Sequence, residues 1–327
     1  VASIRPPHHG KDLRTSIDLR LQYLAYRTLK SAIKSHSARS GSIVVLDVRT
    51  GEVLAMVNQP TYNPNDRSQF SAERYRNRAI TDIFEPGSSL KPLVVAAALE
   101  SGQYLPTSIV DTAPGFIVVG PKKIEDTRNL GRVSLTTILA RSSNVGITKL
   151  AMTLQPDQLW DTMTQFGLGA LTTSGFPGES AGMLTHYSNW RPISQATLAY
   201  GYGISVTPLQ LAQAYAAIGD DGTMHPISLV ALEQAGEGER VVGEDTASAV
   251  RRMLEEVVRP GGTGTKAAID GYRIAGKTGT AWKFATGGYS QDKYISIFAG
   301  MAPASDPRLA TVVVIDEPTG ELYYGSD

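Results

Sequence analysis

A serine and a lysine stand three residues apart at the predicted start of an apolar helix. Residues 84–92 read FEPGSSLKP and lead into the apolar run 93–99. Pro92 has no N–H and is tolerated only in the first turn of a helix, which places the helix start at or close to Ser88. Ser88 and Lys91 then lie on one face, one turn apart. A neutral lysine in this position can activate a serine hydroxyl for nucleophilic attack.

The spacing alone is a weak signal, because Ser31 and Lys34 have it too and lie on a predicted amphipathic helix. Ser88 differs by the Pro-Gly turn before it and by the helix start that Pro92 imposes. Its lysine partner must also lose a proton near neutral pH. Burial or a cationic neighbour must therefore lower the pKa of Lys91 from its reference value of about 10.4.

A second pair of polar residues, Ser142 and Asn144, lies in the segment ARSSNVG. In a turn, both side chains can face one cavity. A hydroxyl and an amide suit a proton relay and a hydrogen bond to a substrate amide. Taken alone, the segment is more typical of a loop that merely interrupts a helix.

A third element, AGKTGTA, lies on a predicted strand near the C-terminus. Strand alternation places Thr278 and Thr280 on one face and Lys277 on the other. Gly276 and Gly279 leave room for the close approach of another backbone or a ligand. An edge strand of this kind can pair with an extended peptide, and its hydroxyls and ammonium can bind a terminal carboxylate. A simple turn is the alternative interpretation.

The same residues also match a nucleotide-binding pattern. Residues 271–278 fit G-x-x-x-x-G-K-[ST], and 311–317 resemble an acidic strand end that holds magnesium. A phosphate loop must lie between a strand and a helix. Here the middle residues alternate as in a strand, and GTAWKFATGG follows, which predicts no helix. A P-loop NTPase is therefore only a remote alternative.

Composition excludes several classes of protein. The 327 residues carry 31 basic and 31 acidic side chains, which argues against binding nucleic acid through its phosphates. The longest apolar run has seven residues, far short of the roughly 20 of a membrane-spanning helix. The absence of cysteine excludes disulfides and thiolate zinc sites. The five histidines lack ligand spacing, so we expect no metal and no organic cofactor.

Because the chain begins at Val1 without a signal peptide, we interpret it as a fragment whose upstream anchor has been removed.

Hydrophobic periodicity predicts an α+β fold. Strands are expected at 42–47, 52–57, 272–282, 294–301 and 309–315, and helices at 17–37, 88–100, 134–152, 156–166, 192–200, 207–219 and 245–258. This order predicts an antiparallel sheet from both chain ends with a largely helical lobe inserted. We expect a lead-in segment at 1–14 and one domain at 15–327. Its sheet lobe would cover about 15–75 and 260–327, and its helical lobe about 76–259.

In the order S-x-x-K, S-x-N, K-T-G, the three motifs resemble the signature of penicillin-binding proteins and class A β-lactamases. Further segments resemble class B penicillin-binding proteins, of the septal, cell-division type of Gram-negative bacteria: 51–56, 62–65, 76–88, 166–169, 200–203, 207–210 and 298–303. The resemblance covers nearly the whole chain. It implies the penicillin-binding-protein/β-lactamase-like fold with a five-stranded sheet.

The resemblance also implies a D,D-transpeptidase that cross-links peptidoglycan. Ser88 would attack the carbonyl of the penultimate D-alanine of a stem peptide while Lys91 accepts its proton. Ser142 would relay a proton to the departing D-alanine, assisted by Lys277, and Asn144 would hold the substrate amide. The amine of a neighbouring stem peptide would then release the acyl-enzyme.

The remaining site residues follow from the same resemblance. Substrate binding would involve Thr278, Gly279 and Thr280 at the carboxylate, and an aromatic wall of Tyr294, Tyr323 and Tyr324. The backbone N–H groups of Ser88 and Thr280 would form the oxyanion hole. β-Lactams would acylate Ser88. The full-length protein is expected at the periplasmic face of the inner membrane, with a membrane glycan polymerase and other division proteins as partners.

Two rival functions remain, a non-catalytic β-lactam sensor and a serine β-lactamase. A sensor should lack the division-type segments. A β-lactamase needs a second base that aims a water at the ester, for which Glu179 is the candidate. Position 183 is methionine, which cannot orient a water as an amide does, and the glycines near Glu179 favour a surface turn.

Overall fold

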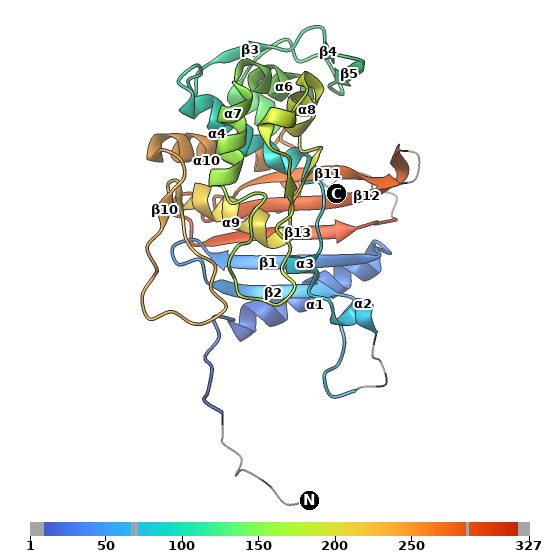
Figure 1. Ribbon diagram of the computed structural model, residues 1–327, viewed down its shortest axis with the longest axis vertical. Coiled ribbons are helices and arrows are strands. Elements are labelled where there is room, and N and C mark those ends of the chain that lie inside the picture. The colour runs from blue at the N-terminus through green and yellow to red at the C-terminus, as the bar shows by residue number, and fades with distance from the viewer. Residues whose placement is uncertain (1–9, 67, 69–70, 286–287, 320–327) are drawn as a thin grey trace, which may run out of the picture.

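A five-stranded antiparallel sheet from both ends of the chain forms the base of the structure (Figure 1). The computed structural model describes residues 10–66, 68, 71–285 and 288–319. Strand order is β11-β12-β13-β1-β2. The bounds are β1 Ser40–Asp47, β2 Val53–Gln59, β11 Ala275–Ala285, β12 Gly288–Ala302 and β13 Leu309–Asp316. The predicted sheet is confirmed, and β11 is one of its two edge strands.

Helices cover both faces of this sheet. Helix α1 (Leu19–Ser35) begins at Asp18, whose side chain accepts hydrogen bonds from two backbone N–H groups, and buries Ala25 and Leu29 against one face. Helix α9 (Pro208–Gly219) is buried along its whole length on the other face. With both faces covered, every residue of β1 is buried.

The chain between β2 and β11 builds the remaining helices and several short strands (Figure 1). The helices are α2 Ala72–Tyr75, α3 Arg78–Thr81, η2 Gly87–Leu90, α4 Lys91–Glu100, α5 Leu135–Ala140, α6 Asn144–Thr153, α7 Pro156–Gln165, η3 Tyr187–Asn189, α8 Pro192–Leu198, α10 Glu244–Val258 and η4 Thr265–Ala267. The strands are β3 Ile109–Asp111, β4 Phe116–Val119, β5 Lys122–Glu125, β6 Arg132–Ser134, β7 Met183–Leu184, β8 Ile204–Ser205, β9 Thr223–Met224 and β10 Glu239–Arg240.

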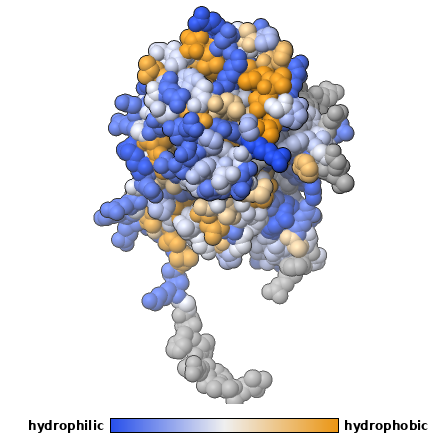
Figure 2. Space-filling view, turned by 45° about the horizontal axis from the view of Figure 1, so that its top comes forward, coloured by the Kyte–Doolittle hydropathy of each residue, from blue (hydrophilic) through white to orange (hydrophobic). Residues whose placement is uncertain are grey.

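Two expectations for this region need correction. The single helix predicted over 134–152 is two helices, because Ser142 has a left-handed backbone (φ 57°) that no helix continues through. The stretch 109–134 was expected to lie in the helical part without strands, but it pairs as β3 with β6 and β4 with β5. This part exposes the apolar side chains of Leu105, Ile109 and Val118, and Figure 2 shows apolar areas at this end of the molecule.

Helix α4 runs through the core, and its first residue is a lysine. Every residue from Lys91 to Ala98 is buried. Ser88 lies in the 3-10 turn η2 that leads into α4, rather than in the α-helix itself. A 3-10 turn has three residues per turn, so residues at i and i+3 lie directly above one another. The local fold therefore places Ser88 and Lys91 on one side of the turn.

Contacts from two other segments hold the Ser88 turn in place. Gly87 has φ 53° and donates its N–H to the carbonyl of Gly201 at 3.1 Å. A Cβ on Gly201 would lie 2.1 Å from the Gly87 oxygen, so only glycine fits there. The buried Tyr215 hydroxyl, from α9, donates to the Ser89 carbonyl at 2.8 Å.

Within the described ranges, no helix is long and apolar enough to cross a membrane.

Replacing Tyr215 with phenylalanine should destabilise the protein. The Tyr215→Phe variant leaves the buried Ser89 carbonyl without this donor, which we expect to lower the free energy of unfolding by about 1–3 kcal/mol. Denaturant unfolding measures the change. Tyr272→Phe is the matched control, because Tyr272 is 64% exposed. Equal stability of the two variants would contradict the anchoring role of Tyr215.

Candidate active site

The ammonium group of Lys91 is buried and surrounded by three acceptors. Its Nζ donates to the Ser142 carbonyl at 2.6 Å, to Ser142 Oγ at 3.1 Å and to Asn144 Oδ1 at 2.8 Å. The side chain is fully buried because α4 begins inside the core. The structure thus brings the first two predicted motifs into direct contact.

Ser142 is the point at which all three motifs meet. Its Oγ accepts a hydrogen bond from Lys91 Nζ at 3.1 Å and another from Lys277 Nζ at 3.1 Å. A hydroxyl oxygen has two acceptor lone pairs and one O–H donor. With both lone pairs engaged by lysines, the O–H of Ser142 is directed elsewhere. Ser142 and Ser88 both line the pocket described below, so that hydrogen can serve a group bound there.

Both lysines have lowered pKa values. Burial lowers the pKa of Lys91 well below the ordinary lysine value, and the positive charge of Lys277 lowers it further, whereas the Asp126 carboxylate acts in the opposite direction. Burial lowers the pKa of Lys277 to about 7. The Lys277 side chain also donates to the Thr278 carbonyl at 3.0 Å. Near neutral pH, the pair can therefore hold one proton and release another.

Asp126 holds the start of α6 and was missed from the sequence. Its carboxylate accepts from the Ser143 hydroxyl at 2.5 Å and from the backbone N–H groups of Asn144 and Val145 at 2.5 and 3.0 Å. Ser143 Oγ in turn accepts from the N–H of Gly146 at 2.8 Å. A carboxylate at a helix N-terminus is favoured by the helix dipole. The Ser143 cap could have been found from sequence, but the distant carboxylate could not.

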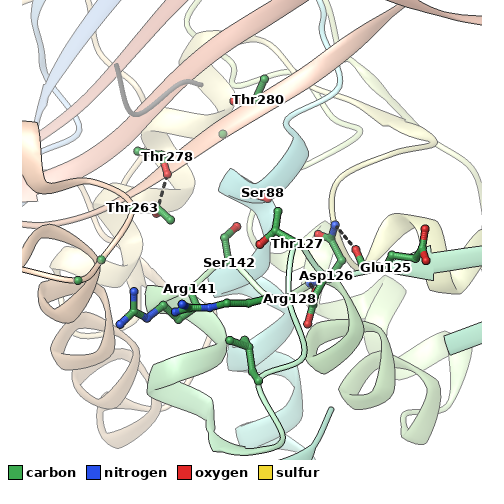
Figure 3. Close-up of a pocket in the computed structure, with 15 residues that line it drawn as sticks. Ser88, Glu125, Asp126, Thr127, Arg128, Arg141, Ser142, Thr263, Thr278 and Thr280 are labelled. Carbon is green, nitrogen blue, oxygen red and sulfur yellow. Dashed lines mark hydrogen bonds between the residues drawn. The ribbon is translucent and has the colours of Figure 1, made fainter. Parts of the chain in front are cut away.

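A pocket of about 600 Å³ opens above these groups (Figure 3). It is lined by Ser88, Glu125, Asp126, Thr127, Arg128, Leu130, Arg141, Ser142, Asn144, Gly261, Gly262, Thr263, Thr278, Gly279 and Thr280. The strand β11 supplies one wall, and the chain after β5 supplies another. Among the described residues, the Ser88 side chain has no hydrogen-bond partner. Catalytic hydrogen bonds often tighten only when substrate binds.

The wall made by β11 closely approaches the Ser88 turn. A Cβ on Gly279 would lie 3.0 Å from the Pro86 oxygen and 3.3 Å from the Ser89 nitrogen. Gly279 therefore permits the close approach that the sequence suggested. Thr278 Oγ1 donates to Thr263 Oγ1 at 2.8 Å, and Thr278 and Thr280 both line the pocket. The edge strand thus presents two hydroxyl side chains to the space above Ser88.

Of the three predicted aromatic residues, only Tyr294 lies in the described part of the chain, and it does not line this pocket. Tyr294 is buried in β12 and packs against Trp282 with ring centroids 6.2 Å apart, and it is not among the lining residues. Tyr323 and Tyr324 lie outside the described residues. The aromatic wall therefore stays a prediction.

Glu179 is engaged in its own loop. Its carboxylate accepts from the Thr172 N–H at 2.6 Å, from the Thr172 hydroxyl and from the Ser174 hydroxyl at 2.9 Å. Gly178 beside it has φ 78°, a turn conformation. Glu179 does not line the pocket, so it has no access to an ester on Ser88.

The structure also bears on nucleotide and metal chemistry. Lys277 and Thr278 lie inside β11, and the strand continues to Ala285, so no helix N-terminus follows them. The arrangement that a phosphate loop requires is not formed. In the part of the chain that the structure describes, no group of three or more histidine or acidic residues could hold a metal ion.

Comparison with known proteins agrees with this arrangement. The family model for the penicillin binding protein transpeptidase domain matches residues 41–327. The probable peptidoglycan D,D-transpeptidase PenA of Neisseria meningitidis serogroup A is 44% identical over 321 residues, which are 98% of this chain and 55% of that protein. The peptidoglycan D,D-transpeptidase FtsI of Escherichia coli K12 is 48% identical over 314 residues, 96% of this chain and 53% of that protein.

A solved structure shares the fold. The apo structure of the TP domain from Burkholderia pseudomallei penicillin-binding protein 3 superposes with a TM-score of 0.88 at 42% identity, covering 96% of this chain and 91% of that one. The chain spans about half the length of the curated relatives it matches. Motifs, fold and relatives agree that this chain belongs to the class B penicillin-binding proteins and comprises their transpeptidase domain.

Proposed function

We propose that this chain carries a serine D,D-transpeptidase activity that cross-links peptidoglycan stem peptides. The observation that supports it most is the hydrogen bonding of Ser142 Oγ to two buried lysines, next to Ser88 in one pocket. This arrangement supplies a nucleophile, a base and a proton relay around one pocket. The edge strand β11 supplies a place for an extended peptide to bind.

In the acylation step, Ser88 Oγ attacks the carbonyl carbon of the penultimate D-alanine. A new C–O bond forms and the Ser88 proton passes to the neutral amine of Lys91. The lowered pKa of Lys91 makes that neutral form more accessible than in an ordinary lysine, since burial and the nearby Lys277 both disfavour the charged form. The Asp126 charge moderates this shift.

In the second half of acylation, the C–N bond to the terminal D-alanine breaks and its nitrogen takes up a proton. Ser142 is the proposed donor, because its O–H is not used by the lysines that bond its oxygen. Lys277 replaces that proton. A pKa of about 7 allows Lys277 both to carry and to give up a proton at neutral pH.

Substrate binding is proposed for the residues of the pocket wall. Thr278 and Thr280 hold the terminal carboxylate, and Gly279 leaves room for the peptide. Asn144 holds the substrate amide. The backbone N–H groups of Ser88 and Thr280 form the oxyanion hole, in which one donor typically contributes about 2.7–4 kcal/mol. Deacylation then requires an amine from a neighbouring stem peptide, which forms the cross-link and returns a proton to Ser88.

The setting of the full-length protein is also a proposal. FtsI and PenA are named as peptidoglycan D,D-transpeptidases, which supports peptidoglycan as the substrate and β-lactams as covalent ligands of Ser88. We place the full-length protein at the periplasmic face of the inner membrane. A membrane glycan polymerase and other division proteins are its proposed partners.

The first prediction concerns the nucleophile. Incubated with a labelled penicillin, the protein should gain one covalent adduct, on Ser88, because that residue lies one turn before the buried Lys91 and its side chain lines the pocket without a hydrogen-bond partner among the described residues. Ser88→Ala should lose the adduct. Ser31→Ala is the matched control, since Ser31 has the same S-x-x-K spacing on the surface helix α1, and it should keep the adduct. Intact-mass spectrometry and peptide mapping measure both. A label mapped to another serine would refute the assignment.

The second prediction separates a transpeptidase from a β-lactamase. The penicilloyl-enzyme should survive for many minutes after free penicillin is removed, because Glu179 is bound to its own loop and cannot activate a water. A general base typically contributes about 10²–10⁴-fold to such a step. Mass spectrometry over time measures the adduct, and Glu179→Gln should leave its lifetime unchanged. Loss of the adduct within seconds, abolished by Glu179→Gln, would identify a β-lactamase instead.

A further inference from the structure

The pocket extends well beyond the groups that the proposed acylation uses. On the far side of Ser142 from Thr280 lie Arg128 and Arg141 (Figure 3), and Gly261 and Gly262 also line the pocket. Arg141 immediately precedes Ser142, so the turn that fixes Ser142 also fixes the backbone of Arg141. Arg128 follows Asp126, which anchors its segment to the start of α6. Both arginines therefore stand on backbone that the active site itself holds.

Neither guanidinium has an acidic partner. In the described part of the chain, the side chains of Arg128 and Arg141 make no hydrogen bond and no ion pair, and both are exposed to the pocket. The two acidic residues that share the lining are already engaged. Glu125 pairs with Lys123 at 2.5 Å, and Asp126 accepts from three donors at the start of α6. This end of the pocket thus carries two unneutralised positive charges.

A loop of small residues leaves space beside these charges. Gly261 has φ 92°, and a Cβ on it would lie 3.2 Å from Nη2 of Arg141. The same loop continues to Thr263, which bonds Thr278 on the wall assigned to the terminal carboxylate. The arginines therefore lie beyond that carboxylate, on the side from which the terminal D-alanine would leave. An acceptor amine must reach the ester through the space that the leaving group vacates.

We propose that Arg128 and Arg141 form a subsite for a carboxylate of the acceptor, the peptide whose amine attacks the acyl-enzyme. This proposal rests on the proposed transpeptidase function. A guanidinium binds a carboxylate through two parallel N–H donors, which orients the ligand as well as attracting it. An acceptor held in this way has already lost part of its translational and rotational freedom. Its amine is therefore better placed to attack the ester. After Ser88 has been acylated, the arginines thus favour aminolysis of the acyl-enzyme over its hydrolysis.

The test measures how the acyl-enzyme divides between an amine and water. A thioester of an N-acyl-D-alanine serves as donor: the Ser88 ester forms, the C–S bond breaks and the thiolate leaves. An added amine then forms an amide, the ester C–O bond breaks and the proton returns to Ser88. The acceptors are Nα-acetyl-D-lysine, whose side-chain amine attacks and which carries a carboxylate, and its carboxamide, which carries none. Chromatography of the two products gives the ratio of aminolysis to hydrolysis, which is independent of how much acyl-enzyme forms.

We expect wild-type protein to prefer Nα-acetyl-D-lysine over its carboxamide more strongly than Arg128→Gln or Arg141→Gln does. Each substitution should reduce that preference about twofold to fivefold, the range of an exposed ion pair. Comparing protein variants cancels the different reactivity of the two amines. Arg252→Gln is the matched control: it removes the same charge from the adjoining hollow, where Arg252 bonds Ser248, and should leave the preference unchanged.

Two results would overturn the subsite. The preference could be the same in wild type and in both arginine variants, or Arg252→Gln could reduce it equally, which would indicate general charge attraction. Failure of the proposed function looks different. In that case neither the thioester nor labelled penicillin forms an adduct on Ser88 in wild-type protein, and both proposals fall together. An adduct with an unchanged ratio overturns the subsite alone.

Discussion

The structure depends on one hydroxyl oxygen, that of Ser142, which accepts hydrogen bonds from two buried lysines. Lys91 and Lys277 both lie 3.1 Å from Ser142 Oγ, and both are fully buried. Two like charges around one oxygen, away from water, repel each other and are poorly solvated. The repulsion is relieved when one amine gives up its proton. The protein thereby obtains a neutral lysine near neutral pH, which an exposed lysine does not provide.

Much of the scaffold serves to keep these groups together. Lys91 comes from the core helix α4, Lys277 from the edge strand β11, and Ser142 from the turn between α5 and α6. Asp126 holds the start of α6, and Tyr215 holds the turn that carries Ser88. These elements together keep both lysines within hydrogen-bond distance of Ser142 Oγ. Burying an ammonium is costly unless its hydrogen-bond acceptors are held in place. The surrounding packing holds those acceptors for both lysines.

The sequence predicted the parts of this arrangement that local rules govern. Pro92 located the helix start at Ser88, alternation located β11, and the order of strands and helices predicted the sheet from both ends. The helix expected over 134–152 ran through Ser142, although the segment also favoured a loop that interrupts a helix, because a left-handed serine has no reliable local signal. The Asp126 carboxylate and the unpaired arginines were also missed. Their importance comes from contacts between segments, such as Asp126 with Asn144, that no periodicity encodes.

The most direct test of the lysine pair is the pH dependence of acylation by labelled penicillin. We expect the rate constant to rise with pH as Lys91 loses its proton, with the midpoint well below the ordinary lysine value because Lys91 is buried beside Lys277. In Lys277→Ala that positive charge is gone, so the pKa of Lys91 should rise and the midpoint should move to higher pH. The absolute rate does not enter the comparison. A midpoint at the ordinary lysine value, or one that stays unchanged in Lys277→Ala, would contradict the account.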